Sequence, residues 1–374
     1  MYFHKIINGD CITELKKIES SSIDLIFADP PYWMRVSGIL KRTDGSEFDG
    51  CQDDWDQFDS LAEYENFTFS WLSECYRVLK PSGSIWVIGS MQCIYMIGYC
   101  MQKIGFWFIN DVIWHKKNPT PNFAGTRLNN SHETLIWATK SSKSKFTFNY
   151  KTAKELNTDN VSELEFSKGI RKQLGSVWKI GICIGNERLK DGNGYKIHST
   201  QKPQELLYRI INISSSIGDV ILDPFGGTMT TGAVAKLCGR NFIGIEKSEK
   251  YCLYGLNRIK NIKESIGDIE KAVFDEKPLK VTLEEMIENK YLIENEFLFL
   301  SNETVKVILL KDGKVILESG EVTNIHEAVA KVKDLKVPRV NGFDYWFVKR
   351  DDEYVSLKKI REIYREYKKA IIDE

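Results

Sequence analysis

Four consecutive residues, Asp29-Pro30-Pro31-Tyr32, place a carboxylate, a rigid backbone and an aromatic ring directly after the apolar run of residues 23–28. A carboxylate oxygen of Asp29 and the carbonyl of Pro30 could accept both hydrogens of an exocyclic amine, while Tyr32 stacks on the ring carrying it. The prolines would hold these acceptors in place before a substrate arrives. The motif therefore favours chemistry on the amino group of an extruded nucleobase. Taken alone, it could also be a strand that ends in a Pro-Pro turn with an Asp cap.

A second motif spans residues 220–235 and combines a β-branched run, a glycine-containing turn and a helix-like stretch. Its turn, Asp223-Pro224-Phe225-Gly226-Gly227, would let the backbone approach a ligand outside the carboxyl end of a strand. The next apolar run, residues 241–246, ends in Glu246, at the distance typical of an acid that binds ribose hydroxyls. A glycine turn alone could equally be an ordinary tight turn, but the acid at this spacing favours a nucleotide-like cofactor.

The third motif is His198-Ser199-Thr200-Gln201-Lys202-Pro203, which precedes apolar positions at helical spacing in residues 204–211. By itself it is compatible with a polar loop that caps a helix. It becomes informative in combination with the other two motifs.

Along the chain the Asp29 motif comes first, then His198–Pro203, then the Asp223 motif, and in this chain order they resemble the motifs of amino-group DNA methyltransferases of the β subclass, which use S-adenosylmethionine. Finer features resemble the GANTC-specific adenine methyltransferases, the CcrM-like and HinfI-like group, and lie at residues 7–11, 53–58, 86–90, 118–123, 132–137 and 185–188. The similarity runs from about Ile7 to about Ile259, with a weaker echo at residues 341–346.

The resemblance implies that Asp29, Pro30, Pro31 and Tyr32 act on the target adenine. Asp at position 29, where cytosine-modifying members more often have Ser, favours adenine-N6 over the alternative, cytosine-N4. The resemblance also implies which residues bind the cofactor. Asp223, Phe225 and Gly227 would line its methionine part, Glu246 would bind the ribose and Asp10 the adenine. Thr200, Gln201 and Lys202 would lie near its carboxylate.

One position departs from the family pattern, because Met229 stands where a second glycine is usual and Gly226 occupies the variable position before it. If this backbone has a positive φ or lies against the cofactor, methionine would cost about 1 kcal/mol or more and would narrow the pocket. A flexible apolar side chain could instead pack against the sheet. A catalytically silent DNA-binding relative is therefore the alternative from a different functional class.

The strand-like and helix-like runs around these motifs predict an α/β fold. With the resemblance, we expect a Rossmann-like S-adenosylmethionine-dependent methyltransferase with circularly permuted motif order. We expect this domain to span residues 1–275, with a boundary at Glu276-Lys277-Pro278. Residues 61–79 read as a helix, 80–83 as a turn and 84–88 as a strand.

Residues 279–374 read as a small α+β appendage with short strands at 297–300, 305–309 and 314–317 and a helix at 325–332. The aromatic run at residues 343–348 could stack on bases or form core, and the resemblance favours DNA binding by this appendage.

The formal net charge of zero gives no support for nucleic-acid binding, so the distribution of charge matters more. Three polar segments are candidates for target recognition, residues 33–60, 115–132 and 151–195, and the last is also a candidate dimer contact. The side chains expected to contact DNA are Lys116, Lys117, Asn122, Arg127, Asn129 and His132. Each basic cluster could instead be a solvated face, and the amide and imidazole groups could serve turns.

Composition is that of a soluble enzyme with a sizeable core: 374 residues, 42% of them hydrophobic. No run approaches about 20 consecutive apolar residues, so we expect a cytoplasmic protein with no membrane partner. The eight cysteines show no zinc spacing, and we expect no metal. The resemblance implies a homodimer acting on double-stranded DNA. Whether the enzyme serves beside a cognate restriction endonuclease or as a solitary regulatory enzyme in DNA replication stays open.

Overall fold

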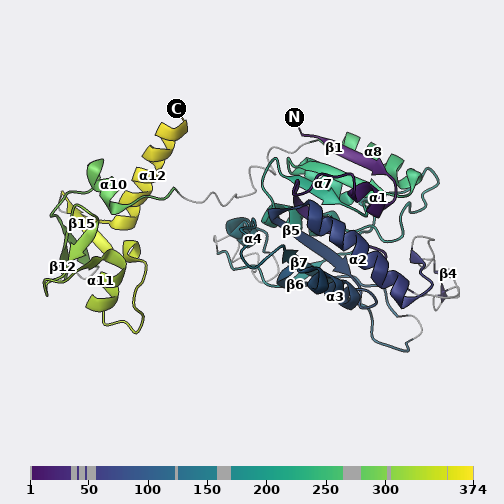
Figure 1. Cartoon of the computed structure of the whole chain (residues 1–374), viewed down its shortest axis with the longest axis horizontal. Coiled ribbons are helices and arrows are strands. Elements are labelled where there is room, and N and C mark those ends of the chain that lie inside the picture. Colours follow the sequence, from purple (N-terminus) through teal and green to yellow (C-terminus); the bar gives the residue numbers. More distant parts are fainter. Residues whose placement is uncertain are drawn as a thin grey trace. The chain divides into compact units, whose positions relative to one another are not determined.

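The computed structural model describes residues 2–34, 40–41, 47–48, 56–122, 125–157, 170–263, 279–300, 305–351 and 353–373. The chain divides into two compact units, Met1–Asp275 and Glu276–Glu374 (Figure 1). Most of the polar segment 33–60, and residues 158–169 of the segment 151–195, lie outside the described residues.

The larger unit is built on a mostly parallel sheet. Along the sheet the described strands are β1 (His4–Asn8), β10 (Asn241–Glu246), β9 (Val220–Asp223), β2 (Ile23–Ala28), β5 (Leu79–Gly89), β7 (His132–Thr139), β6 (Trp107–Lys116) and β8 (Val177–Ile180). Only β7 is antiparallel to its described neighbours. The strand before the Asp29 motif, β2, pairs directly with β9, which carries Asp223. Two motifs almost 200 residues apart in the sequence are therefore adjacent in space.

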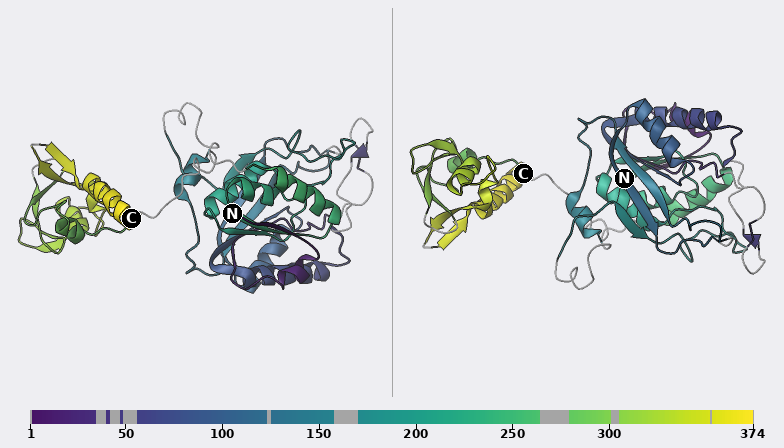
Figure 2. Two further views of the ribbon diagram at one scale, coloured as in Figure 1. Left: turned by 90° about the horizontal axis from the view of Figure 1, so that it is seen from above. Right: turned by 90° about the horizontal axis from the view of Figure 1, so that it is seen from below.

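Helices cover both faces of this sheet (Figure 2). One face packs on α1 (Cys11–Leu15), α2 (Leu61–Val78) and α3 (Ile94–Ile104), and the other on α4 (Tyr150–Glu155), α6 (Gln204–Ser214), α7 (Thr230–Leu237) and α8 (Glu249–Asn261). Strands buried on both faces are expected to be near-continuously apolar, and β2 is apolar at every position except Asp24. This three-layer arrangement confirms the predicted α/β methyltransferase fold, with the predicted cofactor strands at β9 and β10.

The predicted turn at residues 80–83 is part of β5 rather than a separate connection. The pairing with β2 jumps from Ile23–Leu79 to Leu25–Ser84, so the intervening residues bulge out of the ladder. Pro81 has no N–H to donate, which suits a bulge. Gly83 is required because an added Cβ would lie 2.9 Å from the Asp24 carbonyl oxygen.

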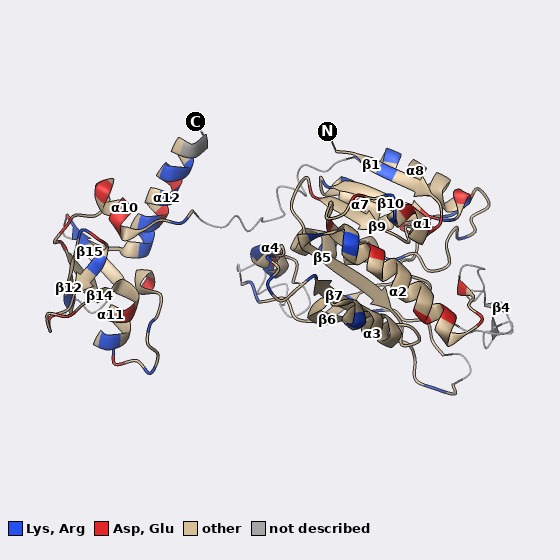
Figure 3. Ribbon diagram, in the orientation of Figure 1, with Lys and Arg blue, Asp and Glu red and all other residues tan. Residues whose placement is uncertain are grey.

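The smaller unit contains an antiparallel sheet of strands β14 (Val322–Asn324), β13 (Lys314–Ile316), β12 (Lys306–Leu309), β11 (Phe297–Leu300), β15 (Trp346–Arg350) and β16 (Glu353–Ser356). Its helices are α10 (Leu283–Glu288), α11 (Ile325–Val332) and α12 (Leu357–Asp373). Lys and Arg outnumber acids along α12 (Figure 3). The described residues also form a short hairpin in the larger unit, β3 (Leu40–Lys41) and β4 (Glu47–Phe48). No helix in the described ranges is long and apolar enough to cross a membrane.

The aromatic run at residues 343–348 is partly core, one of the two roles that the sequence left open for it. Phe343 lies in a 3₁₀ turn, Gly342–Asp344, and Trp346 begins β15; both side chains are buried. The indole N–H of Trp346 donates to the Ile325 carbonyl oxygen at 3.0 Å. Neither ring has a free face for a base, because each packs within the hydrophobic core of this unit.

Candidate active site

The catalytic and cofactor motifs meet at one edge of the large sheet. Parallel strands present their carboxyl ends at the same edge, and antiparallel β7 presents its first residues there. A cavity of about 1650 Å³ opens at this edge. Its lining includes the strand-end residues Asp10, Asp29, Ser90, Glu133, Asp223 and Glu246. Pockets for one small ligand are usually about 300–1,000 Å³, so this cavity has room for two ligand groups.

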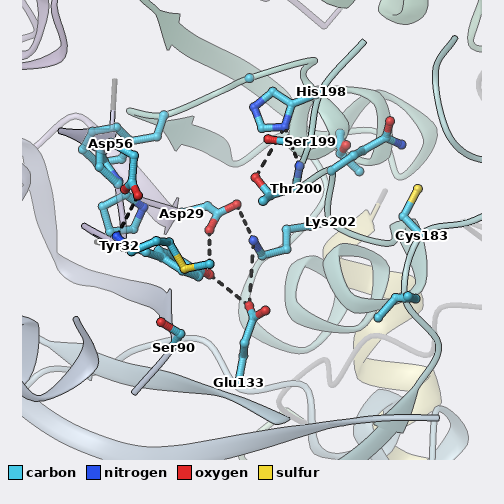
Figure 4. Close-up of a pocket in the computed structure, with 18 of the residues that line it drawn as sticks. Asp29, Tyr32, Asp56, Ser90, Glu133, Cys183, His198, Ser199, Thr200 and Lys202 are labelled. Atoms are coloured by element: carbon cyan, nitrogen blue, oxygen red, sulfur yellow. Dashed lines mark hydrogen bonds and ion pairs between the residues drawn. The ribbon is translucent and has the colours of Figure 1, made fainter. Parts of the chain in front are cut away.

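Asp29 sits at the end of β2 and is hydrogen-bonded on both carboxylate oxygens (Figure 4). Its Oδ1 lies 3.0 Å from the Tyr32 hydroxyl, and its Oδ2 lies 2.8 Å from Nζ of Lys202. The Tyr32 hydroxyl also lies 2.9 Å from Oε2 of Glu133. Because a phenol carries one proton, the hydroxyl donates to one of the two acids at a time.

The network continues from Lys202 through Glu133 to a second cation, Lys116. Nζ of Lys202 is 3.8 Å from Oε2 of Glu133 and 5.1 Å from the centre of the Tyr32 ring. Oε1 of Glu133 lies 2.7 Å from Nζ of Lys116. Two acids and two lysines thus form one nearly buried cluster, with formal charges that balance.

The two acids of this cluster differ in their electrostatics. Burial raises the pKa of Asp29 above its ordinary value, although Lys202 opposes the shift. Burial also favours the neutral form of Glu133, but Lys202 and Lys116 outweigh it and lower the pKa of Glu133. Glu133 is therefore the more firmly ionised acid, and Asp29 takes up a proton more readily.

The backbone of the Asp29 motif is held from outside by two side chains. The Tyr64 hydroxyl donates to the Pro31 carbonyl oxygen at 2.8 Å. The Asp56 carboxylate accepts from the backbone N–H groups of Trp33, at 2.6 Å, and Met34, at 2.8 Å. Trp33 has a φ of 50°, an unfavourable conformation for a side chain of this size, and these contacts fix it.

On the neighbouring strands, the acids are held by backbone N–H groups. Asp223 accepts from the Phe225 N–H at 3.0 Å and from the Thr231 hydroxyl at 2.5 Å. Glu246 accepts from the N–H of Gly227 at 2.8 Å and of Ser248 at 2.7 Å. Burial raises the pKa of Asp223 to about 7 and also raises the pKa of Glu246.

The glycine turn presents its backbone directly to the cavity. Gly227 has a φ of +50°, and a Cβ there would lie 3.2 Å from Nε2 of His198. Phe225 packs edge-on against Trp71, with ring centres 5.1 Å apart. Asp10 lines the same cavity and caps α1 by accepting from the Thr13 N–H at 3.0 Å. The exposed backbone and flanking acids fit a cofactor with hydroxyl and ammonium groups.

The residues after His198 have separate roles in the structure. The Thr200 N–H donates to Nδ1 of His198 at 3.2 Å. Gln201 is buried, accepts from the Leu189 N–H at 3.0 Å and donates to the Glu187 carbonyl oxygen at 2.9 Å. Gln201 thus holds the segment 187–189 against the cavity.

Met229 adopts the left-handed conformation, with a φ of 58°, at the start of α7. Its side chain is fully buried and fills the space left by glycines: a Cβ on Gly244 would lie 2.6 Å from its sulfur, and one on Gly255 would lie 2.3 Å from its Cγ. The predicted positive φ is therefore present. The predicted narrowing of the pocket is not, because the side chain packs among the glycines of β10 and α8.

Of the predicted DNA-contact residues, Lys116 lies in an ion pair inside the cavity, and most of the others lie at the cavity mouth. Lys116 is paired with Glu133, whereas Lys117 is exposed. Asn122 donates to the Arg127 carbonyl oxygen at 2.8 Å and closes the loop. The residues of this loop that line the cavity are Thr120, Pro121, Asn122, Arg127, Leu128, Asn129, Asn130, Ser131 and His132.

Three residues of this site were not singled out from the sequence: Glu133, Asp56 and Tyr64. Glu133 carried a signal, because it is an acid at the start of an otherwise apolar strand. Asp56 belongs to an acidic cluster that reads as a solvated face, and Tyr64 belongs to the apolar face of α2. No sequence pattern alone indicates that these two hold the Asp29 motif.

The fold is that of an α/β methyltransferase, with the glycine turn after β9 beside the Asp29 motif after β2. The family profile described as DNA methylase matches residues 23–257, and the chain belongs to this family. The chain is 48% identical to the type II methyltransferase M.HinfI of Haemophilus influenzae over 97% of each chain. It is 36% identical to the type II methyltransferase M2.DpnII of Streptococcus pneumoniae, over 71% of this chain and 94% of that protein.

A solved structure, the cytosine-N4-specific PvuII DNA methyltransferase, shares the fold with a TM-score of 0.52 and 19% identity. It covers 72% of this chain and 92% of that chain. Family and relatives together identify the predicted enzyme: the chain is an adenine-specific DNA methyltransferase that uses S-adenosylmethionine.

Proposed function

We propose that Asp29 and the Pro30 carbonyl accept the two hydrogens of the target adenine N6 amine and that Tyr32 stacks on the base. One observation carries this proposal: β2 pairs with β9, so Asp29 opens into the same cavity as Asp223 and the glycine turn. When bound, S-adenosylmethionine supplies the electrophilic methyl group. The high pKa of Asp29 suits it to take the proton that the amine loses.

The cofactor half of the cavity is assigned to Asp10, Asp223, Phe225, Gly227 and Glu246. Gly227 lets the backbone approach the ligand, and Glu246 is fixed by two backbone donors, which suits an acceptor for ribose hydroxyls. Thr200 lies beside His198 at the same wall and is a candidate partner of the cofactor carboxylate. Gln201 supports that wall through segment 187–189, and Lys202 belongs to the Asp29 cluster.

The target is proposed to be GANTC in double-stranded DNA, read by the loop between β6 and β7. Lys117, Arg127, Asn129 and His132 are exposed, and the last three line the cavity mouth, as recognition loops mounted on rigid strands do. The segments 33–60 and 151–195 and the C-terminal unit, 279–374, are proposed to add DNA contacts. We further propose that the enzyme acts as a homodimer in the cytoplasm. This proposal holds whether or not the enzyme has a cognate restriction endonuclease.

The test is incubation of the purified protein with S-adenosylmethionine and DNA of mixed sequence, followed by single-molecule mapping of modified bases. Methyl-adenine confined to GANTC is the expected result. Methyl-adenine at another sequence would overturn the target alone. An absence of modified bases despite DNA binding would favour the silent relative.

A further inference from the structure

The acceptor that the proposed function assigns to the target amine is already engaged. Oδ2 of Asp29 accepts from Lys202, and Oδ1 lies within hydrogen-bonding distance of the Tyr32 hydroxyl, which Asp29 shares with Glu133. The lysine contact is a charge-assisted bond at 2.8 Å in a buried site, the kind that competes most strongly with a neutral amine donor. An amine that binds to Asp29 must therefore displace or weaken existing contacts.

Glu133 offers both displaced donors another acceptor on one atom. Its Oε2 lies 2.9 Å from the Tyr32 hydroxyl and 3.8 Å from Nζ of Lys202. Bringing Lys202 from 3.8 Å to the 2.8 Å of its present ion pair needs a shift of only about 1 Å, well within side-chain motion.

Glu133 is also held so that it can receive a cation without moving. Its side chain projects from the second residue of β7, which is paired with Trp114 of β6. Its other oxygen, Oε1, is fixed by Lys116 at 2.7 Å. Because the cluster contains two acids and two lysines, its net charge stays the same when Lys202 moves from Asp29 toward Glu133.

We propose that Glu133 is a positioning residue for methyl transfer: it takes Lys202 and the Tyr32 hydroxyl when the target amine occupies Asp29. This inference rests on the proposed role of Asp29. It gives Lys202 and Lys116 functions within the base-binding half of the cavity, where Lys202 holds Asp29 between turnovers and Lys116 anchors Glu133.

The experiment compares Glu133→Gln with the native protein in single-turnover methylation at saturating cofactor and DNA. Glutamine keeps the shape but loses the charge that draws Lys202 away, so the rate should fall about 10- to 100-fold. Dissociation constants for S-adenosylmethionine and target DNA should change less than about threefold. A rate within about threefold of the native value would overturn the inference.

The pH profile separates positioning from a structural role. The charge of Glu133 helps raise the pKa of Asp29, so its removal should move the acidic limb of the single-turnover rate to lower pH. An unmoved limb would also overturn the inference. Glu65→Gln is the control, because Glu65 lies on α2, pairs with Lys103 at 3.7 Å outside the cavity lining and should leave the limb unchanged.

Two further variants keep the test decisive. Glu133→Asp retains the charge but shortens the reach, so it should slow the reaction and leave the limb in place; it also serves if Glu133→Gln fails to fold. Asp29→Asn separates the two proposals. Full activity of Asp29→Asn would reject the proposed role of Asp29, whereas an inactive Asp29→Asn with a native-like Glu133→Gln would reject only the role of Glu133.

Discussion

The two halves of the cavity hold their acids in different ways. On the side assigned to the cofactor, Asp223 and Glu246 each accept from backbone N–H groups of the turns that follow their strands, and Asp223 also accepts from the Thr231 hydroxyl of α7. On the base side, Asp29 and Glu133 are held by the side chains of Lys202, Lys116 and Tyr32. Backbone donors are fixed by the fold, whereas side-chain donors can exchange between acceptors by rotation.

With the proposed assignment of residues, this difference favours a preformed cofactor site beside a base site that can rearrange. Fixed donors orient an acid at no cost when the ligand arrives, which suits a ligand that enters the same way in each cycle. Side-chain donors can leave an acceptor such as Asp29 when a flipped base binds to it, and can hydrogen-bond to that acceptor again after the base leaves. Substitutions in the two halves should therefore have different effects. Those on the base side should lower the rate of methyl transfer, and those on the cofactor side should weaken the affinity for S-adenosylmethionine.

The largest effect is expected for Asp29→Asn. An amide accepts hydrogen bonds more weakly than a carboxylate and cannot take a proton, so the single-turnover rate should fall by about 10²- to 10⁴-fold. Affinity for S-adenosylmethionine, measured by calorimetry, should stay within about threefold of native, because the cofactor-side acids are held independently. A matching loss of cofactor affinity would contradict the division into two halves.

A pH-dependent effect on stability is expected from Asp223. Burial raises its pKa from 3.8 to about 7, so the folded protein binds a proton that the unfolded chain releases. The resulting stabilisation is complete below about pH 4 and is lost as the pH rises through about 7. A shift of this size is worth on the order of 4 kcal/mol at most.

Asparagine cannot ionise, so Asp223→Asn should flatten the decline in the free energy of unfolding between about pH 5 and pH 8. The decline is measured as the difference in the free energy of unfolding between pH 5 and pH 8, from urea denaturation of the native protein and of the variant without cofactor. Glu249→Gln, an exposed substitution at the start of α8, is the control and should keep the native decline. A native decline in Asp223→Asn would show that Asp223 is not the titrating group.

A smaller effect is expected for Glu246→Gln. The glutamine amide would face one of the two backbone N–H groups that Glu246 accepts from, and that donor would lose its partner. Hydrogen bonds to charged groups contribute about 1.5–3 kcal/mol, so the dissociation constant for S-adenosylmethionine should rise about 10- to 100-fold. The rate at saturating cofactor should return to near native. A rate loss that persists at saturation would place Glu246 in the chemical step.

Much of the fold was predictable because its strands follow local rules. The runs that became β2, β9 and β10 are mostly apolar and end in, or directly before, an acid, and a parallel sheet brings such ends to one edge. The C-terminal strand β11 and helix α11 also have the predicted bounds. The short strand β8 was missed, because its four residues lie within the otherwise polar segment 151–195.

The site was less predictable, since its network depends on contacts between distant strands. The motif placed Asp29 and Tyr32 together, but nothing near Lys202 in the sequence indicates that its partner is Asp29 rather than a ligand. Lys116 reads as half of an exposed basic pair, and only the register of β6 against β7 brings it to Glu133. Side-chain pairing across a sheet is set by register, which short sequence windows do not encode.

The smallest effect on function is expected for Met229→Gly, which restores the residue usual in the family. Glycine would relieve a left-handed backbone that costs about 1–3 kcal/mol for other residues. It would also empty the space among Gly226, Gly244 and Gly255, and loss of a buried methionine side chain costs about 2–5 kcal/mol. The variant should therefore be less stable in urea by roughly 1–3 kcal/mol. Cofactor affinity should change less than about threefold, because the side chain packs within the fold and not against the ligand. A large gain in affinity would instead show that Met229 obstructs the cofactor half, which would then not be preformed.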